Sequence, residues 1–155
     1  DEIVLGVIYD PVHDECFSAV KGGGAHLNGK HIGVSTQGDL TKALVAMGFP
    51  YDDLGRMGDY LDILENVNSQ TRGIRRPGAA ALDMAYLACG RFDSFYEYGL
   101  SPWDVAAGSL IVQEAGGKVT DFSGSQDYIF GRQILGSNGL LHFRLIQMLE
   151  GWDRK

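Results

Sequence analysis

The residue types best suited to chemistry lie in one stretch, 97–108, which reads Glu-Tyr-Gly-Leu-Ser-Pro-Trp-Asp-Val-Ala-Ala-Gly. Ser101 and Pro102 predict the N-cap and first position of a helix, which places Asp104 at its third position. A carboxylate there lies among free backbone N–H groups at the positive end of the helix dipole, so its charged form is favoured and its direction fixed. Such a group suits an oxygen ligand for Mg²⁺. On spacing alone, Ser-x-x-Asp more often marks a plain capping box.

Glu97 is the second candidate, because it ends a predicted strand seven residues before Asp104. Ligands of α/β proteins bind where strand ends face helix starts. Taken alone, a glutamate at this position is more often a solvated surface residue. One or two carboxylates also hold Mg²⁺ weakly without substrate phosphate, since the ion keeps several waters and prefers octahedral oxygen geometry.

Other patterns carry weaker indications of a site. The glycine-rich segment 21–24 is not a P-loop, because no Gly-Lys-Ser/Thr follows it. The histidines show no metal-ligand spacing and are expected at the surface; they are His13, His26, His31 and His142.

Several residues are predicted to have structural roles only. Ser101 and Ser137 lack the Gly-x-Ser-x-Gly context of a nucleophile elbow. Asp83 lies within an apolar helical stretch and is assigned no chemistry. Trp103 is expected in the core, and Cys89 is expected to be a small buried apolar residue.

The composition is that of an ordinary globular chain of 155 residues, with 45% hydrophobic and 21% charged residues. The formal net charge of −7 argues against nucleic acid or an anionic membrane as the main partner. A phosphate substrate would then need a cation between it and the protein, which bound Mg²⁺ would supply. Cys16 and Cys89 form no Cys-x-x-Cys pair, so a zinc cluster is disfavoured, and two reduced thiols fit a cytoplasmic protein.

Hydrophobic patterning predicts antiparallel strands in the first third of the chain and alternating helices and strands afterwards. The first strand, 3–9, is β-branched and apolar and is expected to be buried on both faces. Asn28-Gly29 is a strong hairpin signal. Further strands are predicted at 15–20, 25–27, 30–32, 43–49, 73–76, 92–96, 118–120 and 133–135. Helices are predicted at 56–68, 80–88 (with Gly90 as its C-cap), 102–115 and, as a final amphipathic helix, around Leu141–Leu149.

The segment Trp-Asp-Val-Ala-Ala-Gly at 103–108, followed by Glu-Ala-Gly-Gly at 114–117, resembles the second signature of the inositol monophosphatase family. The resemblance extends over essentially the whole chain. It also includes the segments 22–29, 76–83, 90–93 and 135–138. It implies a layered α/β (α+β) fold with mixed and antiparallel sheets flanked by helices, as in the C-terminal portion of a sugar phosphatase.

The resemblance also implies roles for individual residues. Asp104 matches an aspartate that binds a catalytic metal and lies near a substrate hydroxyl. Glu97 matches a glutamate that hydrogen-bonds a hydroxyl of the inositol or sugar ring. Gly78 and Ala80 match positions whose backbone lines the substrate pocket. Family members use two or three Mg²⁺ ions, and inhibition by lithium is a common trait.

The family's first signature, Asp-Pro-Ile/Leu-Asp-Gly-Thr/Ser, and its upstream metal-binding glutamate are absent from residues 1–155. The segment 10–14, Asp-Pro-Val-His-Asp, lacks the required spacing and is interpreted as a turn. We therefore expect 1–155 to be a single incomplete domain, without the N-terminal metal-binding segment that holds the water-activating residues. We expect the isolated chain to be inactive, with apolar surface and a sheet edge left uncovered.

The expected function is Mg²⁺-dependent hydrolysis of inositol monophosphate or a related small sugar phosphate. Three alternatives remain open. A 3′(2′),5′-bisphosphate nucleotidase or a fructose-1,6-bisphosphatase would keep the fold and change the substrate. A catalytically incomplete half-domain would act as a binding module. Some bacterial relatives contact RNA or the transcription machinery, although the charge of −7 weighs against direct nucleic-acid binding. A homodimer is implied by the resemblance alone.

Overall fold

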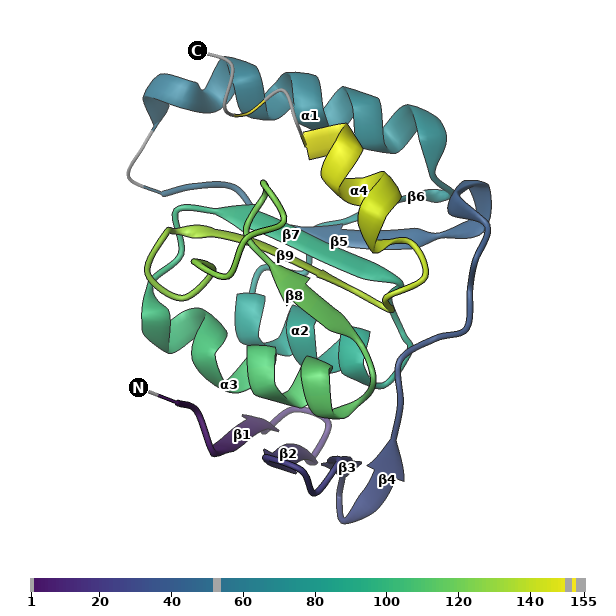
Figure 1. The fold of residues 1–155 in the computed structure, drawn as a ribbon, viewed down its shortest axis with the longest axis vertical. Helices are drawn as coiled ribbons and strands as arrows, with labels where there is room; N and C mark the ends of the chain where they lie inside the picture. The colour runs from purple at the N-terminus through teal and green to yellow at the C-terminus, as the bar shows by residue number, and fades with distance from the viewer. Residues whose placement is uncertain (1, 52–53, 150–151, 153–155) are drawn as a thin grey trace.

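The computed structural model describes residues 2–51, 54–149 and 152. Within them, two β-sheets alternate with two layers of helices (Figure 1). The order through the molecule is a four-stranded sheet, helices α2 (Ala80–Ala88) and α3 (Pro102–Glu114), a five-stranded sheet, and helices α1 (Met57–Gln70) and α4 (His142–Leu149) (Figure 1). This layered arrangement confirms the expected class of mixed and antiparallel sheets flanked by helices.

The four-stranded sheet is an antiparallel meander in the order β1-β2-β3-β4. Its strands are β1 (Leu5–Asp10), β2 (Glu15–Val20), β3 (Ala25–Leu27) and β4 (Lys30–Ile32). Asn28 and Gly29 both have positive φ, at 49° and 75°, as the tight turn between β3 and β4 requires. The hairpin predicted from these two residues is therefore confirmed.

Strand β1 is buried on one face only, which corrects the expectation of burial on both. Its inner face lies on α3, where a Cβ at Gly6 would come within 2.8 Å of the Ala107 carbonyl oxygen. Leu5, Val7 and Tyr9 point outward and are exposed. The strand carries apolar residues on both faces, which is why the sequence predicts burial on both. In the described part of the chain, helices cover only one of these faces. Uncovered apolar surface was itself expected, and the structure shows it here.

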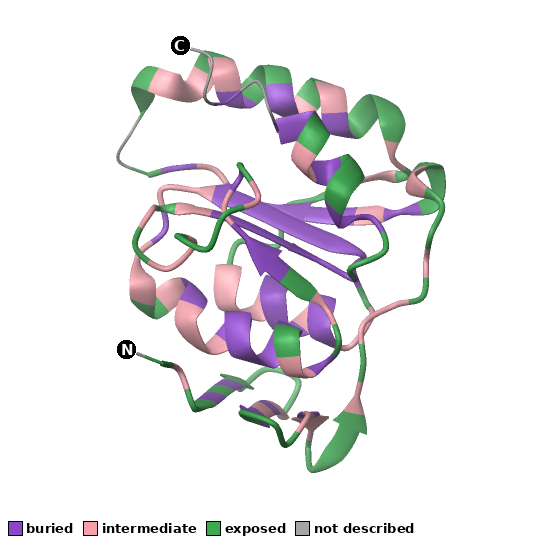
Figure 2. Ribbon diagram, in the orientation of Figure 1, coloured by how far each residue is buried: buried purple, intermediate pink, exposed green. Residues whose placement is uncertain are grey.

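The five-stranded sheet has the order β6-β5-β7-β9-β8 and lies at the centre of the molecule (Figure 1). Strand β5 pairs in parallel with β6 and β7, while β9 is antiparallel to β7 and β8. Its strands are β5 (Leu44–Met47), β6 (Gly73–Arg75), β7 (Ser94–Tyr98), β8 (Lys118–Thr120) and β9 (Gln133–Ser137). Helices cover both faces, so the middle strands are buried along nearly their whole length (Figure 2).

The helices are α1 (Met57–Gln70), α2 (Ala80–Ala88), α3 (Pro102–Glu114) and α4 (His142–Leu149), with short 3₁₀ turns at Leu40–Lys42 and Leu54–Arg56. Helix α2 ends at Ala88 with Cys89 as its C-cap, and the left-handed residue Gly90 follows. None of the helices in the described ranges is long and apolar enough to cross a bilayer.

Helix α3 lies between the two sheets and packs closely on α2. A Cβ at Gly108 would come within 2.7 Å of the Met84 Cβ, so glycine allows the two helices to approach. Trp103, which was expected in the core, is 81% exposed. It lies in the first turn of α3, at a position that neither sheet covers among the described residues.

His142 is another residue that the sequence placed wrongly, since it is buried rather than at the surface. Its Nδ1 lies 2.8 Å from the Ser137 hydroxyl and its Nε2 lies 2.9 Å from the Thr120 hydroxyl. These contacts join the start of α4 to β8 and β9. Burial lowers the pKa of the imidazole to about 4, so His142 is neutral near pH 7 and has a structural role.

Candidate functional site

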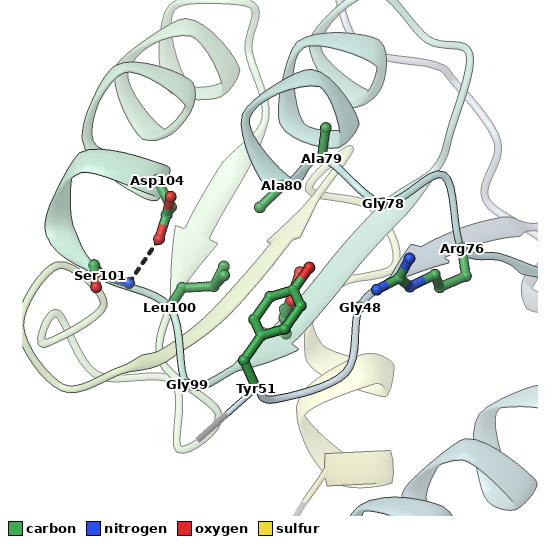
Figure 3. A pocket seen from close by; sticks show the side chains of 11 residues that line it. Gly48, Tyr51, Arg76, Gly78, Ala79, Ala80, Gly99, Leu100, Ser101 and Asp104 are labelled. Atoms are coloured by element: carbon green, nitrogen blue, oxygen red, sulfur yellow. Dashed lines mark hydrogen bonds between the residues drawn. The ribbon is translucent and has the colours of Figure 1, made fainter. Parts of the chain in front are cut away.

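A pocket of about 330 Å³ opens where strands β5 and β7 end and helices α2 and α3 begin. This is the part of an α/β sheet at which ligands are expected to bind. Figure 3 shows the side chains that line it. The lining residues are Gly48, Tyr51, Arg76, Gly78, Ala79, Ala80, Glu97, Gly99, Leu100, Ser101 and Asp104. All four predicted site residues, Gly78, Ala80, Glu97 and Asp104, are among them.

Asp104 reaches the pocket because α3 begins beside it. The backbone N–H of Ser101 donates to Asp104 Oδ2 at 2.9 Å, which fixes the carboxylate across the first turn (Figure 3). The capping box expected from Ser-x-x-Asp is therefore present, and the capping carboxylate also lines the pocket. The structural and the functional interpretations of Asp104 are compatible, since a carboxylate has lone pairs for more than one partner.

Glu97 lines the pocket and is only 4% exposed, so it is not the solvated surface glutamate that its position alone would suggest. Burial raises its pKa to about 8, with a further increase from the neighbouring Asp83 carboxyl. The Arg76 guanidinium opposes this shift, and Asp104 adds to it. Near pH 7 the Glu97 carboxyl is therefore largely protonated and able to donate a hydrogen bond.

Asp83 is the residue that sequence reasoning missed. It lies in α2 behind the pocket, is 1% exposed, and its Oδ1 has no hydrogen-bond partner among the described residues. Burial raises its pKa to about 7, although Arg76 lowers it. An aspartate inside an apolar helix was the available signal, because an unpartnered buried carboxyl is costly unless a nearby site uses it.

Gly78 and Ala80 form the wall at the start of α2. Gly78 has φ of +101°, a conformation that favours glycine, and its backbone turns the chain from β6 into the helix. A Cβ at Gly78 would lie 2.9 Å from Arg76 Nη1, so glycine also leaves room for the guanidinium at the rim. The wall is thus made mainly of backbone and small side chains, which leaves space for a ligand ring.

The described residues do not form a complete metal site by themselves, since they contain no group of three or more His, Cys, Asp or Glu side chains placed to hold an ion. Asp104 fits a single ligand to a hard cation, being a carboxylate with a fixed direction at the pocket edge.

A family model for the inositol monophosphatase family matches residues 1–152. The chain belongs to the inositol monophosphatase family. The resemblance carried by segments 103–108 and 114–117 is thereby confirmed.

Two curated relatives illustrate the range of names in this family. The chain is 48% identical over 134 residues to "Nus factor SuhB" of Pseudomonas aeruginosa, covering 85% of the chain and 49% of the relative. It is 40% identical over 149 residues to "Inositol-1-monophosphatase" of Mesorhizobium japonicum, covering 96% of the chain and 56% of the relative. The chain thus spans about half the length of the curated relatives it matches.

Solved structures of family members have the same fold. The extragenic suppressor protein suhB from Bartonella henselae superimposes with a TM-score of 0.91 at 44% identity, over 95% of this chain and 56% of that one. The inositol monophosphatase from Anabaena (Nostoc) sp. PCC 7120 gives a TM-score of 0.89 at 43% identity, over 95% of this chain and 58% of that one.

Proposed function

We propose that the protein containing this chain is a Mg²⁺-dependent phosphatase of inositol monophosphate or a related small sugar phosphate. In this proposal the chain supplies the substrate-side wall of the active site and one metal ligand. The observation that carries it is the convergence of Asp104, Glu97 and the Gly78–Ala80 backbone on one pocket. Membership of the inositol monophosphatase family supports the reaction class.

The pocket offers two different carboxyl groups to a substrate. Asp104, fixed by the Ser101 N–H, provides an acceptor for a hydroxyl near the phosphate and a ligand for Mg²⁺. Glu97, largely protonated, provides a hydrogen-bond donor and an acceptor for a ring hydroxyl. Bound Mg²⁺ ions would supply charge neutralisation of the phosphate and activation of a water. The chain's own residues would hold the ring in place and orient the ester toward that site.

A substrate panel measured on the full-length protein tests this assignment. We expect Mg²⁺-dependent release of phosphate from inositol monophosphate to exceed release from adenosine 3′,5′-bisphosphate and fructose 1,6-bisphosphate. We expect Glu97→Gln to raise KM for inositol monophosphate more than it lowers kcat, because the residue binds the ring and not the reacting phosphorus. A preference for either bisphosphate would contradict this assignment, and that bisphosphate would then be the proposed substrate.

The isolated 155-residue chain is proposed to be inactive, because the described residues offer Asp104 without the further carboxylates that Mg²⁺ needs. Mg²⁺-dependent turnover by residues 1–155 alone, lost on Asp104→Asn, would contradict this. Inhibition by lithium, a homodimeric state and a cytoplasmic location remain predictions from the family resemblance.

The similarity to a relative named "Nus factor SuhB" favours a second candidate function. The chain would then be part of a module that binds RNA or the transcription machinery. The formal charge of −7 favours a protein partner over direct contact with RNA. An RNA mobility shift at physiological salt would show direct RNA binding and would contradict the expectation that nucleic acid is not a partner.

A further inference from the structure

Position 48 requires glycine for a different reason from the glycines in the turns of this chain. It follows β5 directly, and its φ lies outside the left-handed region, so its backbone conformation does not require glycine. A Cβ built at Gly48 would lie 2.2 Å from Cδ, Oε1 and Oε2 of Glu97. The missing side chain of Gly48 therefore provides the space that the Glu97 carboxyl occupies.

Tyr60 fixes the backbone on which that space depends. Its hydroxyl, carried by α1, donates to the Gly48 carbonyl oxygen at 2.7 Å. The Tyr60 side chain is fully buried and its ring packs against Phe49, Tyr96 and Trp152. Burial raises the pKa of Tyr60 well above its usual value, so the hydroxyl remains a donor across the accessible pH range. Gly48 therefore cannot move away from Glu97 without breaking a buried hydrogen bond.

The Glu97 carboxyl is enclosed by this backbone and by α2, where the buried Asp83 approaches it closely enough to raise its pKa. It is 4% exposed and lines the pocket. A buried carboxyl with unused hydrogen-bonding capacity is matched by a ligand that brings a donor and acceptor of its own.

We propose that Gly48 and Tyr60 are positioning residues that set the depth of the Glu97 carboxyl, and that the seat they form selects a substrate with a ring hydroxyl at the pocket floor. This inference rests on the proposed function and adds to it the residues that determine specificity. The seat favours a neutral hydroxyl over a second phosphate, because the group that lines it is the Glu97 carboxyl, with the buried Asp83 carboxyl close behind.

The test is a Gly48→Ala variant of the full-length protein, compared on two substrates. Inositol 1-phosphate carries ring hydroxyls, whereas p-nitrophenyl phosphate carries none. We expect Gly48→Ala to raise KM for inositol 1-phosphate about tenfold or more, which corresponds to a loss of about 1.4 kcal/mol in binding. With p-nitrophenyl phosphate we expect a clearly smaller rise in KM, because this substrate offers no ring hydroxyl to Glu97.

Three further variants separate positioning from general damage to the fold. Gly48→Ala combined with Glu97→Asp should recover part of the lost affinity, since the shorter side chain withdraws from the added methyl group. Tyr60→Phe should raise KM for inositol 1-phosphate in the same substrate-specific way, by a smaller factor. Gly58→Ala is the matched control, because nothing lies within 4 Å of a Cβ at that position in α1.

An equal loss on both substrates, or no loss on either, would overturn the inference. If the wild-type protein hydrolyses neither substrate, the proposed function fails separately, and the same variants are then compared by calorimetric binding of inositol 1-phosphate. In that case, weaker binding of inositol 1-phosphate to Gly48→Ala than to Gly58→Ala would support the positioning role of Gly48. Equal binding, or no binding to the wild-type protein, would overturn it.

Discussion

We predict that Asp83 makes the protein less stable as the pH rises, and the Asp83→Asn substitution tests this prediction. The carboxyl is 1% exposed, its Oδ1 has no hydrogen-bond partner among the described residues, and burial raises its pKa from 3.8 to about 7. Its protonated form is therefore favoured by folding. Stability from this group is fully present below about pH 4 and is lost as the pH rises to about 7.

The size of the effect follows from the pKa difference. A shift from 3.8 to about 7 is about 3 pKa units, and each unit corresponds to about 1.4 kcal/mol, so ionising Asp83 costs the folded state about 4 kcal/mol. The Glu97 carboxyl adds to this, because its pKa of about 8 is partly caused by Asp83. Asparagine keeps the shape of the side chain and removes the charge, so it should remove the pH-dependent part of the cost.

The assay is urea unfolding of the full-length wild-type and Asp83→Asn proteins at several values between pH 4 and pH 8. We expect the free energy of unfolding of Asp83→Asn, relative to wild type, to rise by about 4 kcal/mol across this range. Asp62→Asn, at an exposed position on α1, is the matched control and should stay parallel to the wild type. Parallel curves for wild type and Asp83→Asn would refute the reasoning, since the carboxyl would then have an ordinary pKa.

Two further stability predictions concern other parts of the fold. Burial lowers the pKa of His142 from 6.5 to about 4, so the free energy of unfolding should fall by about 3 kcal/mol through this group as the pH falls from 6.5 to 4. In urea unfolding, the His142→Gln variant should lack this loss of stability. An acid profile of the variant equal to that of the wild type would contradict the prediction. Gly108→Ala should destabilise by about 1–3 kcal/mol in thermal unfolding, because the added Cβ would lie 2.7 Å from Met84 Cβ. Gly58→Ala, with open space around it, should not, and equal effects of the two alanines would contradict the close packing of α2 on α3.

Local signals in the sequence predicted much of the fold. The cap and first position at Ser101 and Pro102 fixed the start of α3, and Asn28-Gly29 fixed the hairpin between β3 and β4. Each of these features depends on residues that are neighbours along the chain. Strand β1 was placed correctly but its burial was not, because burial depends on which layers cover a face and not on the residues of the strand alone.

The candidate site was only partly predictable, because its burial also depends on elements that are distant along the chain. Asp104 and the small residues of the wall were found from the capping pattern and the family resemblance. The burial of Glu97 could not be read from the sequence, because it is produced by Gly48, Asp83 and the ends of four different elements. The exposure of Trp103 and the burial of His142 also depend on tertiary structure. No sheet covers Trp103 in the described part of the chain, and the hydroxyls of Thr120 and Ser137 contact the buried imidazole of His142.

The most direct test of the proposed phosphatase function is the Mg²⁺-dependent release of phosphate from inositol 1-phosphate by full-length wild-type, Asp104→Asn and Asp39→Asn proteins. Asp39 is the matched control. Like Asp104, it accepts a hydrogen bond from a backbone N–H, that of Thr41, but it lies outside the pocket. We predict that Asp104→Asn lowers kcat/KM at least about a hundredfold and raises the Mg²⁺ concentration needed for activity, while Asp39→Asn matches the wild type. Full activity and an unchanged Mg²⁺ requirement in Asp104→Asn would contradict the assignment of this pocket as the phosphatase site.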